Sequence, residues 1–245
     1  MTLKKRLIYE GKAKKIFEHK ESDKVIIEFK DDATAFNSLK KAKFKGKGEL
    51  NCQISISIFK YLIKHNIPTH FIGVFSDNSI ISKRVNIFPI EVVLRNIAYG
   101  SICRQTKIEP GTKLQEPLID YYFKDDALGD PLLTKERIKC IEIIDLSELK
   151  YIEDITYKIN NLLKEFFLKI DLNLVDFKLE FGKDQNGEII LADEFSPDNC
   201  RLWDLRTKNV NIRSLDKDRF RNDLGDLIEA YTEINDRIYN FTNSE

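Results

Sequence analysis

Leu174-Val-Asp-Phe-Lys-Leu-Glu-Phe-Gly182 alternates apolar and charged residues at the period of a β-strand, and so does Leu191-Ala-Asp-Glu-Phe-Ser-Pro-Asp-Asn-Cys-Arg-Leu-Trp203. Asn186-Gly187 lies between them, and Asn-Gly is the preferred pair for a two-residue type I′ hairpin turn. With this turn, counting back along both strands places Glu180 opposite Asp193 and Lys178 opposite Phe195. The sequence therefore predicts an antiparallel hairpin with two acids facing each other.

The charged face of this hairpin suits a magnesium ion. Side chains alternate along a strand, so Asp176, Lys178 and Glu180 share one face and the apolar residues between them face the core. Two acids directly opposite each other destabilise a ladder unless a cation lies between them. Mg²⁺ is held by one or two carboxylates together with water and substrate phosphates. The hairpin is therefore interpreted as half of a nucleotide site; the alternative is a solvated edge hairpin with two incidental acids.

The composition indicates a globular protein with a packed core. The chain has 245 residues, of which 42% are hydrophobic and 11% aromatic, enough for one large domain or two small ones. Forty basic residues balance forty acidic ones, so no net charge favours nucleic acid or an anionic membrane. No apolar run has membrane length. We expect neither nucleic acid nor a membrane as a partner.

The cysteines and histidines indicate neither disulfides nor zinc. The four cysteines contain no C-x-x-C and the three histidines no H-E-x-x-H. The start of the chain has too short an apolar run for a signal peptide. A cytoplasmic location is therefore expected.

The first part of the chain is rich in strands. Its periodicity predicts strands at residues 15–17, 24–29, 71–75, 79–83 and 90–97, a loop over 31–48 and a helix over 49–65. Residues 86–89 suit a connector between two lobes. We therefore predict a domain boundary between residues 1–87 and 88–245.

The second part combines the hairpin with helices. A polar, proline-punctuated region over residues 109–131 precedes a long helix that begins at an Asp145 N-cap. A last helix is expected over residues 216–239, with an apolar stripe facing the core. Strands followed by helices around a hairpin predict an α+β fold in two lobes.

Two further motifs suit anions. Gly11-Lys-Ala-Lys14 offers close backbone approach and two point charges for phosphates, although a solvated hairpin tip has the same composition. Residues 87–101 form a buried strand that ends in Arg95, followed by Gly100 and Ser101 at a helix N-terminus, which suits a phosphate or carboxylate. The alternative is an ordinary N-cap beside a surface ion pair. No Walker A or protein-kinase motif occurs.

Motifs along nearly the whole chain resemble those of the phosphoribosylaminoimidazole-succinocarboxamide synthase (SAICAR synthetase) family. Segments 89–101 and 175–182 resemble the two family signatures. Further similar segments are residues 9–14, 44–51, 117–131, 193–204 and 218–221. Two positions depart from the family pattern: Tyr99 replaces a small residue before Gly-Ser, and Asn199-Cys200 replaces Gly-Ser.

This resemblance implies a reaction. It implies ligation of L-aspartate to 5-amino-1-(5-phospho-D-ribosyl)imidazole-4-carboxylate (CAIR), with ATP and Mg²⁺, in de novo purine synthesis. It implies a small N-terminal antiparallel β lobe, a larger α+β C-terminal lobe, an ATP site in the cleft between them and a homodimer. The alternative is a small-molecule kinase of related fold, which would release a phosphorylated product without using an amine.

The resemblance also implies roles for individual residues. The catalytic residues are Lys178, Lys14 and Arg201. Glu180 and Asp193 hold the metal. The ATP residues are Lys12, Ala13, Lys14, Ile16, Lys83, Val85, Lys124, Glu180 and Asp193. The CAIR residues are Arg95, Ser101, Lys178, Asp198 and Arg201. Aspartate is assigned to the loops over residues 32–37 and 45–48, with Asp32, Lys47 and Gly48.

Overall fold

The computed structural model describes residues 6–35, 39–210 and 212–243. Over these residues the chain forms antiparallel sheets with helices packed against them, so the predicted α+β class is confirmed. No helix in these ranges combines the length and apolar character needed to span a bilayer. The first five residues, where no signal peptide is expected, and Asn37 of the predicted aspartate loop lie outside the described residues.

The first sheet has the order β1-β2-β3-β7-β6, with all neighbours antiparallel. The predicted strands in this region are confirmed, and the predicted helix is α1 (Lys47–Lys64), which packs against β3, β6 and β7. The strands are β1 (Leu7–Glu10), β2 (Lys14–Glu18), β3 (Lys24–Phe29), β6 (Phe71–Ser76) and β7 (Ser79–Lys83).

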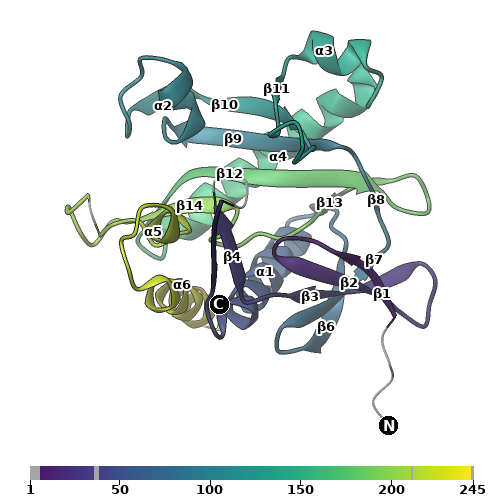
Figure 1. The fold of residues 1–245 in the computed structure, drawn as a ribbon, viewed down its shortest axis with the longest axis horizontal. Helices are drawn as coiled ribbons and strands as arrows, with labels where there is room; N and C mark the ends of the chain where they lie inside the picture. The colour runs from purple at the N-terminus through teal and green to yellow at the C-terminus, as the bar shows by residue number, and fades with distance from the viewer. Residues whose placement is uncertain (1–5, 36–38, 211, 244–245) are drawn as a thin grey trace.

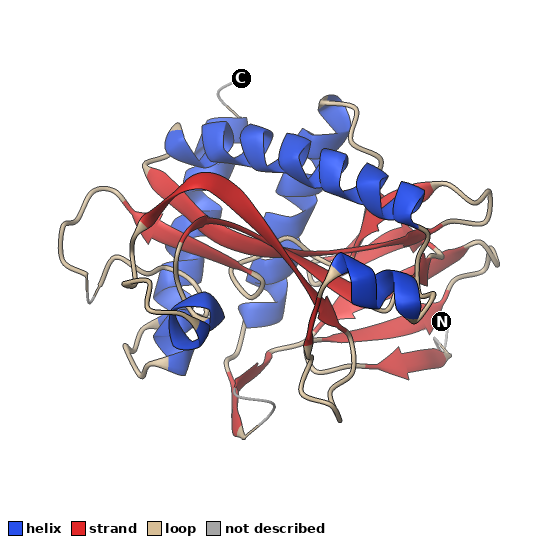
Figure 2. Ribbon diagram, turned by 90° about the horizontal axis from the view of Figure 1, so that it is seen from above, coloured by secondary structure: helices blue, strands red, loops and turns tan. Residues whose placement is uncertain are grey.

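The second sheet is built around β12 (Leu172–Lys183), which contains the first stretch quoted above. Figure 1 shows β12 between the first sheet and the pair of β9 and β10. The long helix α4 (Leu146–Leu168) begins after the predicted N-cap Asp145 and packs against β12, across one face of the strands (Figure 2). The other strands are β8 (Asn86–Ile87), β9 (Ile90–Ile97), β10 (Lys113–Phe123), β11 (Leu132–Leu133), β13 (Ile189–Ala192) and β14 (Cys200–Asp204).

Three segments differ from the predicted organisation. The expected loop over residues 31–48 contains a hairpin, and the polar region over 109–131 contains the strand β10. The last helix is divided, because Asp223, Gly225 and Asp226 adopt positive φ and end the helical path. The additional elements are β4 (Asp32–Ala35), β5 (Lys40–Lys43), α2 (Ser101–Gln105), α3 (Lys135–Cys140), α5 (Asp218–Arg221) and α6 (Leu227–Thr242).

The turn of the central hairpin is one residue longer than predicted. Glu180 pairs with Ala192, so the predicted pairing of Glu180 with Asp193 is wrong. The Asp184 carboxylate accepts hydrogen bonds from two backbone N–H groups of the turn, and Gly187 adopts φ 80°. This is a three-residue loop with glycine in the left-handed conformation. Lys178 is likewise not opposite Phe195: Val93 of β9 is its neighbour on one side, and on the other side its N–H donates to the carbonyl of Asn199.

Contacts cross the predicted domain boundary. Buried apolar residues on both sides of residue 87 belong to one core cluster, and α1 packs against α6. The connector also joins β12, because Ile87 pairs with Gly182. A side chain at Gly182 would overlap the backbone carbonyl of Asn86. The division into residues 1–87 and 88–245 stays a prediction.

Candidate active site

A cavity of about 670 Å³ lies between the first sheet and β12. Its walls come from the β1–β2 turn, from β2 and β3, and, on the opposite side, from β12 and the residues that follow β13. All the residues predicted to contact ATP line this cavity: Lys12, Ala13, Lys14, Ile16, Lys83, Val85, Lys124, Glu180 and Asp193. The fold therefore brings together residues that are up to 181 positions apart, from Lys12 to Asp193.

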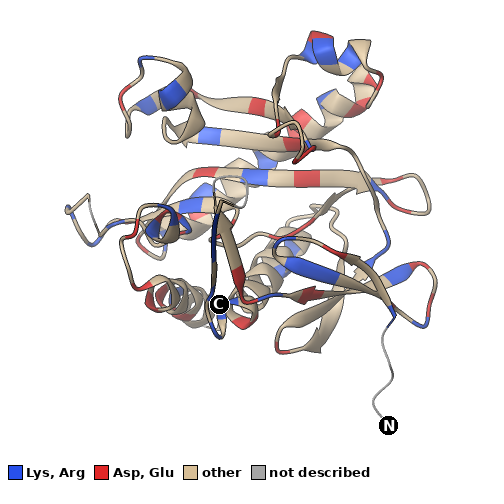
Figure 3. Ribbon diagram, viewed as in Figure 1, with Lys and Arg blue, Asp and Glu red and all other residues tan. Residues whose placement is uncertain are grey.

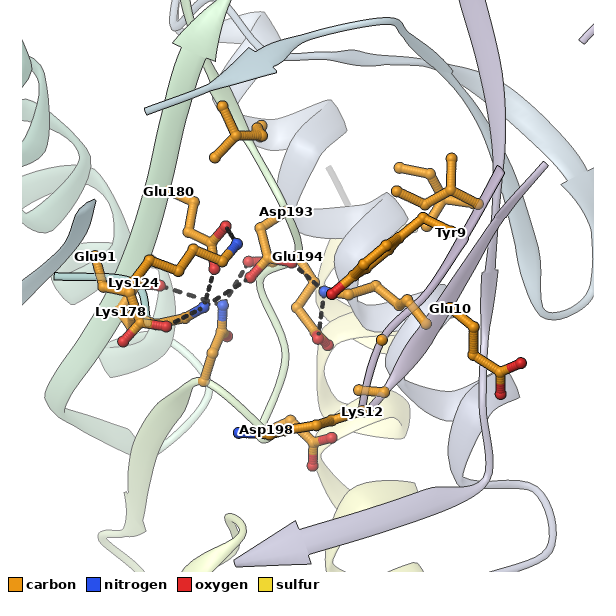
Figure 4. Close-up of a pocket in the computed structure, with 18 of the residues that line it drawn as sticks. Tyr9, Glu10, Lys12, Glu91, Lys124, Lys178, Glu180, Asp193, Glu194 and Asp198 are labelled. Carbon is orange, nitrogen blue, oxygen red and sulfur yellow. Dashed lines mark hydrogen bonds and ion pairs between the residues drawn. The ribbon is translucent and has the colours of Figure 1, made fainter. Parts of the chain in front are cut away.

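Lysines and carboxylates alternate at the centre of the cavity. Lys178 Nζ lies 2.5 Å from Glu180 Oε1, 3.0 Å from Asp193 Oδ2 and 3.3 Å from a carboxylate oxygen of Glu91 (Figure 4). Lys14 Nζ lies 2.7 Å from Glu194 Oε1 and also pairs with Asp193, and Lys124 pairs with Glu180. We call this group the lysine cluster: Lys14, Lys124, Lys178, Glu180, Asp193 and Glu194.

The ion pairs keep these groups charged. Burial by itself lowers the pKa of Lys14 and of Lys178, but Asp193 and the other carboxylates outweigh it, so both pKa values lie above the ordinary one. Burial raises the pKa of Asp193, but Lys14 and Lys178 outweigh it, so this pKa lies well below its usual range. All three side chains are therefore ionised at neutral pH.

Asp193 joins the cluster through an unusual backbone conformation. It follows the last residue of β13, and its φ of 64° lies in the left-handed region, which aspartate enters more readily than most residues. Ala192 takes the position opposite Glu180. The change of backbone direction at Asp193 lets its carboxylate reach Lys178 on the same side as Glu180. The two acids named from the sequence thus lie close together although the predicted register is wrong, and their role as metal ligands stays a prediction.

A second charged group surrounds Asp176 on the same face of β12. Arg95 of β9 and Arg201 of β14 are the direct cross-strand neighbours of Asp176. Asp176 Oδ2 accepts hydrogen bonds from Arg201 Nη1 at 2.7 Å and Arg95 Nη1 at 3.3 Å. Arg95 also donates to Ser101 Oγ at 2.8 Å, and Arg201 donates to Asp218 at 2.7 Å. We call this group the arginine cluster: Arg95, Ser101, Asp176, Arg201 and Asp218.

Both clusters contain residues from one face of β12, as the alternation in the sequence predicts. Figure 3 shows acidic, basic and acidic residues in succession on this strand, which are Asp176, Lys178 and Glu180. All three charged side chains make ion pairs, and the intervening Phe177 and Leu179 are buried in the core, as predicted. Lys178 is therefore the member of the lysine cluster that is adjacent, on the same face of β12, to Asp176 of the arginine cluster.

The residues predicted to bind CAIR are divided between several places. Lys178 and Asp198 line the first cavity. Arg201 lines a second cavity of about 700 Å³, whose other basic residues are Arg104, Lys107 and Arg221. Arg95 is 3% exposed, so it does not form the surface ion pair of the alternative interpretation, and Gly100 rather than Ser101 is the N-cap of α2. The contacts of these residues with CAIR stay a prediction.

The residues predicted to bind aspartate are also separated. Asp32 lines the first cavity. Lys47 is fully buried with its Nζ 2.5 Å from Asp198 Oδ2, and the hydroxyl of Tyr231 donates to Asp198 Oδ1 at 2.7 Å. A Cβ at Gly48 would lie 2.5 Å from the carbonyl oxygen of Phe29. Lys47 and Gly48 thus have structural partners, and their contact with aspartate stays a prediction.

Sequence analysis missed several cavity residues. Glu194 follows Asp193 directly, and Glu91 shares the alternation of β9 with Arg95, so both had a signal in the sequence. His70 and Lys217 also line the cavity, but neither belongs to a pattern that marks a site. Burial lowers the pKa of His70 to about 4, so its ring is neutral at pH 7.

The two departures from the family pattern have visible roles. The Asn199 side-chain amide donates to the backbone carbonyls of Lys178 and Glu194, at 3.2 and 2.6 Å, and so fixes the loop after β13. The ring of Tyr99 packs edge-on against Trp203, and the Arg201 guanidinium lies 5.2 Å from the centre of the Tyr99 ring. Tyr99 therefore supports an arginine of the arginine cluster.

Comparison with known proteins agrees with the geometry. The sequence profile of the SAICAR synthetase family matches residues 7–238. This chain belongs to the SAICAR synthetase family. It is 67% identical to phosphoribosylaminoimidazole-succinocarboxamide synthase of Prochlorococcus marinus subsp. pastoris, over 98% of this chain and 100% of that protein. The resemblance inferred from the sequence motifs is thus confirmed.

Solved SAICAR synthetases share the whole architecture. A SAICAR synthetase in complex with ADP is 52% identical and superposes with a TM-score of 0.90, over 95% of this chain and 97% of that one. The phosphoribosylaminoimidazole-succinocarboxamide synthase of Ehrlichia chaffeensis is 43% identical, with a TM-score of 0.92 over 96% and 98% of the two chains. The SAICAR synthetase fold therefore extends over nearly the entire chain.

Proposed function

We propose that this chain ligates L-aspartate to CAIR with cleavage of ATP, giving SAICAR, ADP and phosphate in de novo purine synthesis. Membership of the SAICAR synthetase family makes the chain an ATP-dependent carbon–nitrogen ligase. The observation that carries the proposal is the position of Lys178 on β12, where it belongs to the lysine cluster and is adjacent on the same face to Asp176 of the arginine cluster. Side chains on one face of a strand repeat about every 6.8 Å. One lysine can thus reach both a nucleotide phosphate and an adjacent carboxylate.

The reaction requires an activated carboxylate, because an oxide is a poor leaving group. The γ-phosphoryl group of ATP is transferred to a carboxylate oxygen of CAIR, which forms an acyl phosphate and releases ADP. The aspartate amine then attacks the carboxyl carbon, phosphate leaves with the electrons of the C–O bond, and the nitrogen loses a proton. This sequence needs no nucleophile from the protein.

The cations of the site supply positioning and electrostatic stabilisation. Lys14 and Lys178 form ion pairs with carboxylates within the cavity. When a nucleotide binds, their ammonium groups can contact phosphate oxygens in place of these carboxylate oxygens. Fixed positive charge near a developing negative charge lowers the barrier of such a transfer. Arg201 offers its guanidinium to the second cavity, where the ribose phosphate of CAIR is proposed to bind.

Glu180 and Asp193 fit the requirements of a magnesium site. Both carboxylates lie within hydrogen-bond distance of the same Lys178 ammonium group, so they converge on one point. Within the described residues no group of three or more acids, histidines or cysteines could hold a metal, and Mg²⁺ normally uses one or two carboxylates with substrate phosphates. When bound, the ion would neutralise charge on the transferred phosphoryl group.

We propose a cytoplasmic homodimer. The four cysteines Cys52, Cys103, Cys140 and Cys200 are free, which suits a reducing compartment. The edge strand β6 exposes Ile72, Val74 and Phe75. Exposed apolar strand edges tend to pair with another chain, and this supports a second copy as the partner.

Phosphate release tests the proposed reaction. We expect release from ATP and Mg²⁺ only when CAIR and L-aspartate are both present, and we expect it to collapse in Glu180→Gln. Glu188→Gln, an exposed acid at the tip of the same hairpin, should retain activity. ATP turnover that is indifferent to aspartate would contradict the ligase and indicate a kinase or a hydrolase.

A further inference from the structure

Lys217 is a cation in the wall of the first cavity that none of the described residues pairs with. The residue is partly exposed, and its ammonium group makes no hydrogen bond or ion pair with any residue in the described ranges. The other lysines that line this cavity all pair with carboxylates: Lys12, Lys14, Lys83, Lys124 and Lys178. A partly buried charge without a partner is costly. Lys217 therefore indicates an anion that comes with a ligand.

The acids that attract Lys217 are already bound to other groups. Asp198 Oδ2 lies 2.5 Å from Lys47 Nζ, and Asp198 Oδ1 accepts a hydrogen bond from the hydroxyl of Tyr231 at 2.7 Å. Glu194 is part of the lysine cluster. Burial lowers the pKa of Lys217 below its ordinary value, and these acids do not restore it. An anion from a substrate would therefore supply a partner that the protein lacks at this point.

The backbone attaches Lys217 close to Lys178. The N–H of Lys217 donates to the carbonyl of Pro197 at 3.0 Å, and the N–H of Lys178 donates to the carbonyl of Asn199 at 2.8 Å. Two residues of extended chain span at most about 7 Å. The same short loop thus holds Lys217 and the lysine that is proposed to face the CAIR carboxylate.

The predicted aspartate loop lies on the other side of Lys217. Asp32 and Thr34 of β4 line the cavity, and β4 packs against α5, which follows Lys217 directly. Lys40 of the paired strand β5 fixes this arrangement, because its Nζ donates to the backbone carbonyl of Phe220 in α5 at 2.6 Å. One end of the cavity thus combines an acid with an unpaired cation, and an amino acid carries both kinds of charge.

We propose that the ammonium group of Lys217 binds a carboxylate of L-aspartate and so holds the aspartate amine near the activated carboxyl group of CAIR. The ATP phosphates have the lysine cluster as partners, and the ribose phosphate of CAIR has the basic residues of the second cavity. The carboxylates of L-aspartate are the anions that remain. Charge-assisted hydrogen bonds between ammonium and carboxylate are among the strong ones. The inference rests on the proposed ligase function.

Steady-state phosphate release by the full chain tests the inference. Lys217→Met removes the charge, and we expect it to raise KM for L-aspartate by about 10- to 100-fold, the range of a hydrogen bond to a charged group. KM for ATP and KM for CAIR should stay unchanged. Lys217→Arg keeps a cation and should retain most of the affinity for L-aspartate. Lys208→Met removes an exposed lysine that lines neither cavity and should behave like the unmodified chain.

Three results with Lys217→Met would overturn the inference alone. An unchanged KM for L-aspartate in an active variant would show that Lys217 does not bind this substrate. A rise in KM for CAIR instead would assign Lys217 to the ribonucleotide. A fall in kcat alone would indicate a role in accepting the proton of the amine. Failure of the unmodified chain to release phosphate with all three substrates would overturn the proposed function, and the inference with it.

A measurement on the unmodified chain covers the case in which the variants do not fold. Acetic anhydride acetylates lysine side chains, and mass spectrometry of peptides reports Lys217 and Lys208 separately. With ADP, Mg²⁺ and CAIR present, no ligation occurs when L-aspartate is added. We expect L-aspartate to slow the acetylation of Lys217 severalfold and to leave that of Lys208 unchanged. Equal rates at Lys217 with and without L-aspartate would overturn the proposal.

Discussion

The lysine cluster and the arginine cluster occupy the same face of β12 but are built from different cations. In the arginine cluster, Arg95 donates to Asp120, Asp176, Ser101, Tyr122 and a backbone carbonyl, so its planar guanidinium is fixed in one orientation. In the lysine cluster, each ammonium group is a point charge on a flexible stem. The side chain of Lys124 is 44% exposed and that of Lys178 is 22% exposed.

Because their cations are held differently, we expect the two clusters to have different functions. Arginines held by several fixed hydrogen bonds maintain the shape of a site, whereas lysines paired only with carboxylates can change partners when phosphates arrive. The arginine cluster should therefore contribute mainly to stability and substrate position, and the lysine cluster mainly to the chemical step. Four experiments test this division.

The largest effect is expected from Asp176→Ala. This variant leaves Arg95 and Arg201 without the acid they share in a buried setting. Removing one partner of a buried ion pair typically costs about 3–5 kcal/mol; since Arg95 keeps Asp120 and Arg201 keeps Asp218, urea denaturation should show a loss near the lower end of that range. Asp126→Ala, which removes the exposed partner of Lys12, should cost less than about 1 kcal/mol. Equal losses would contradict the structural role of the arginine cluster.

Lys178→Met should reduce kcat by about 10²- to 10³-fold, the usual effect of removing one group that stabilises a transition state. Its urea midpoint should change little, because Glu180 keeps Lys124 and Asp193 keeps Lys14. Steady-state phosphate release and urea denaturation measure the two effects. Lys183→Met removes a charge from the same strand outside the cavity and should keep full activity. A stability loss without a loss of kcat would reverse the assignment.

The ion pair between Lys47 and Asp198 belongs to neither cluster. It tests whether the contribution of an ion pair to stability depends more on burial than on the type of cation. Burial raises the pKa of Asp198, but Lys47 outweighs it, so the pKa lies well below its ordinary value. The folded state therefore binds this proton less tightly than the unfolded state. Its stabilising contribution is present above about pH 4 and is lost as the pH falls through the folded-state value, with a slope of at most about 1.4 kcal/mol per pH unit.

Lys47→Met should reduce the pH dependence of stability in acid, because Asp198 then loses the cation that lowers its pKa most and keeps only the weaker effects of Lys217 and Tyr231. Unfolding free energies between pH 2 and 6 measure the slope. Lys45→Met, at an exposed position of the same segment, serves as the control. A slope that is identical in all three proteins would show that Lys47 does not control the titration of Asp198.

The smallest effect is expected from Tyr99→Leu. The variant removes the ring beside the Arg201 guanidinium, and a cation–π contact contributes about 0.5–1 kcal/mol at such a site. KM for CAIR should rise about two- to fivefold while kcat stays unchanged. Tyr99→Phe keeps the ring and should behave like the unmodified chain. If both variants behave alike, the ring does not support Arg201.

Much of the lysine cluster could be predicted because it depends on local pattern. Alternation along β12 and a nearby turn were enough to bring Lys178, Glu180 and Asp193 together. The register was wrong because the Asp184 side chain caps a longer turn, and the left-handed Asp193 then compensated for it. Neither feature follows from the preference of Asn-Gly for a short turn.

Only part of the arginine cluster could be predicted from the sequence. Arg95 and Arg201 were named, but the role of Asp176 depends on β9 and β14 lying on either side of β12, and strand order is not encoded in local periodicity. The strand β10 was missed because Pro117 lies where its pairing with β9 is interrupted, between Lys113 and Leu118. His70 was missed because a single histidine before a strand forms no pattern.

The close approach of Gly182 to Asn86 has a mechanical consequence. These residues form the point where the chain that leaves the first sheet is attached to β12. A methyl group at Gly182 would act as a wedge at that attachment and force the connector outwards. Since the connector also carries Val85 into the cavity wall, a side chain at Gly182 would change the width of the cavity although Gly182 does not line it.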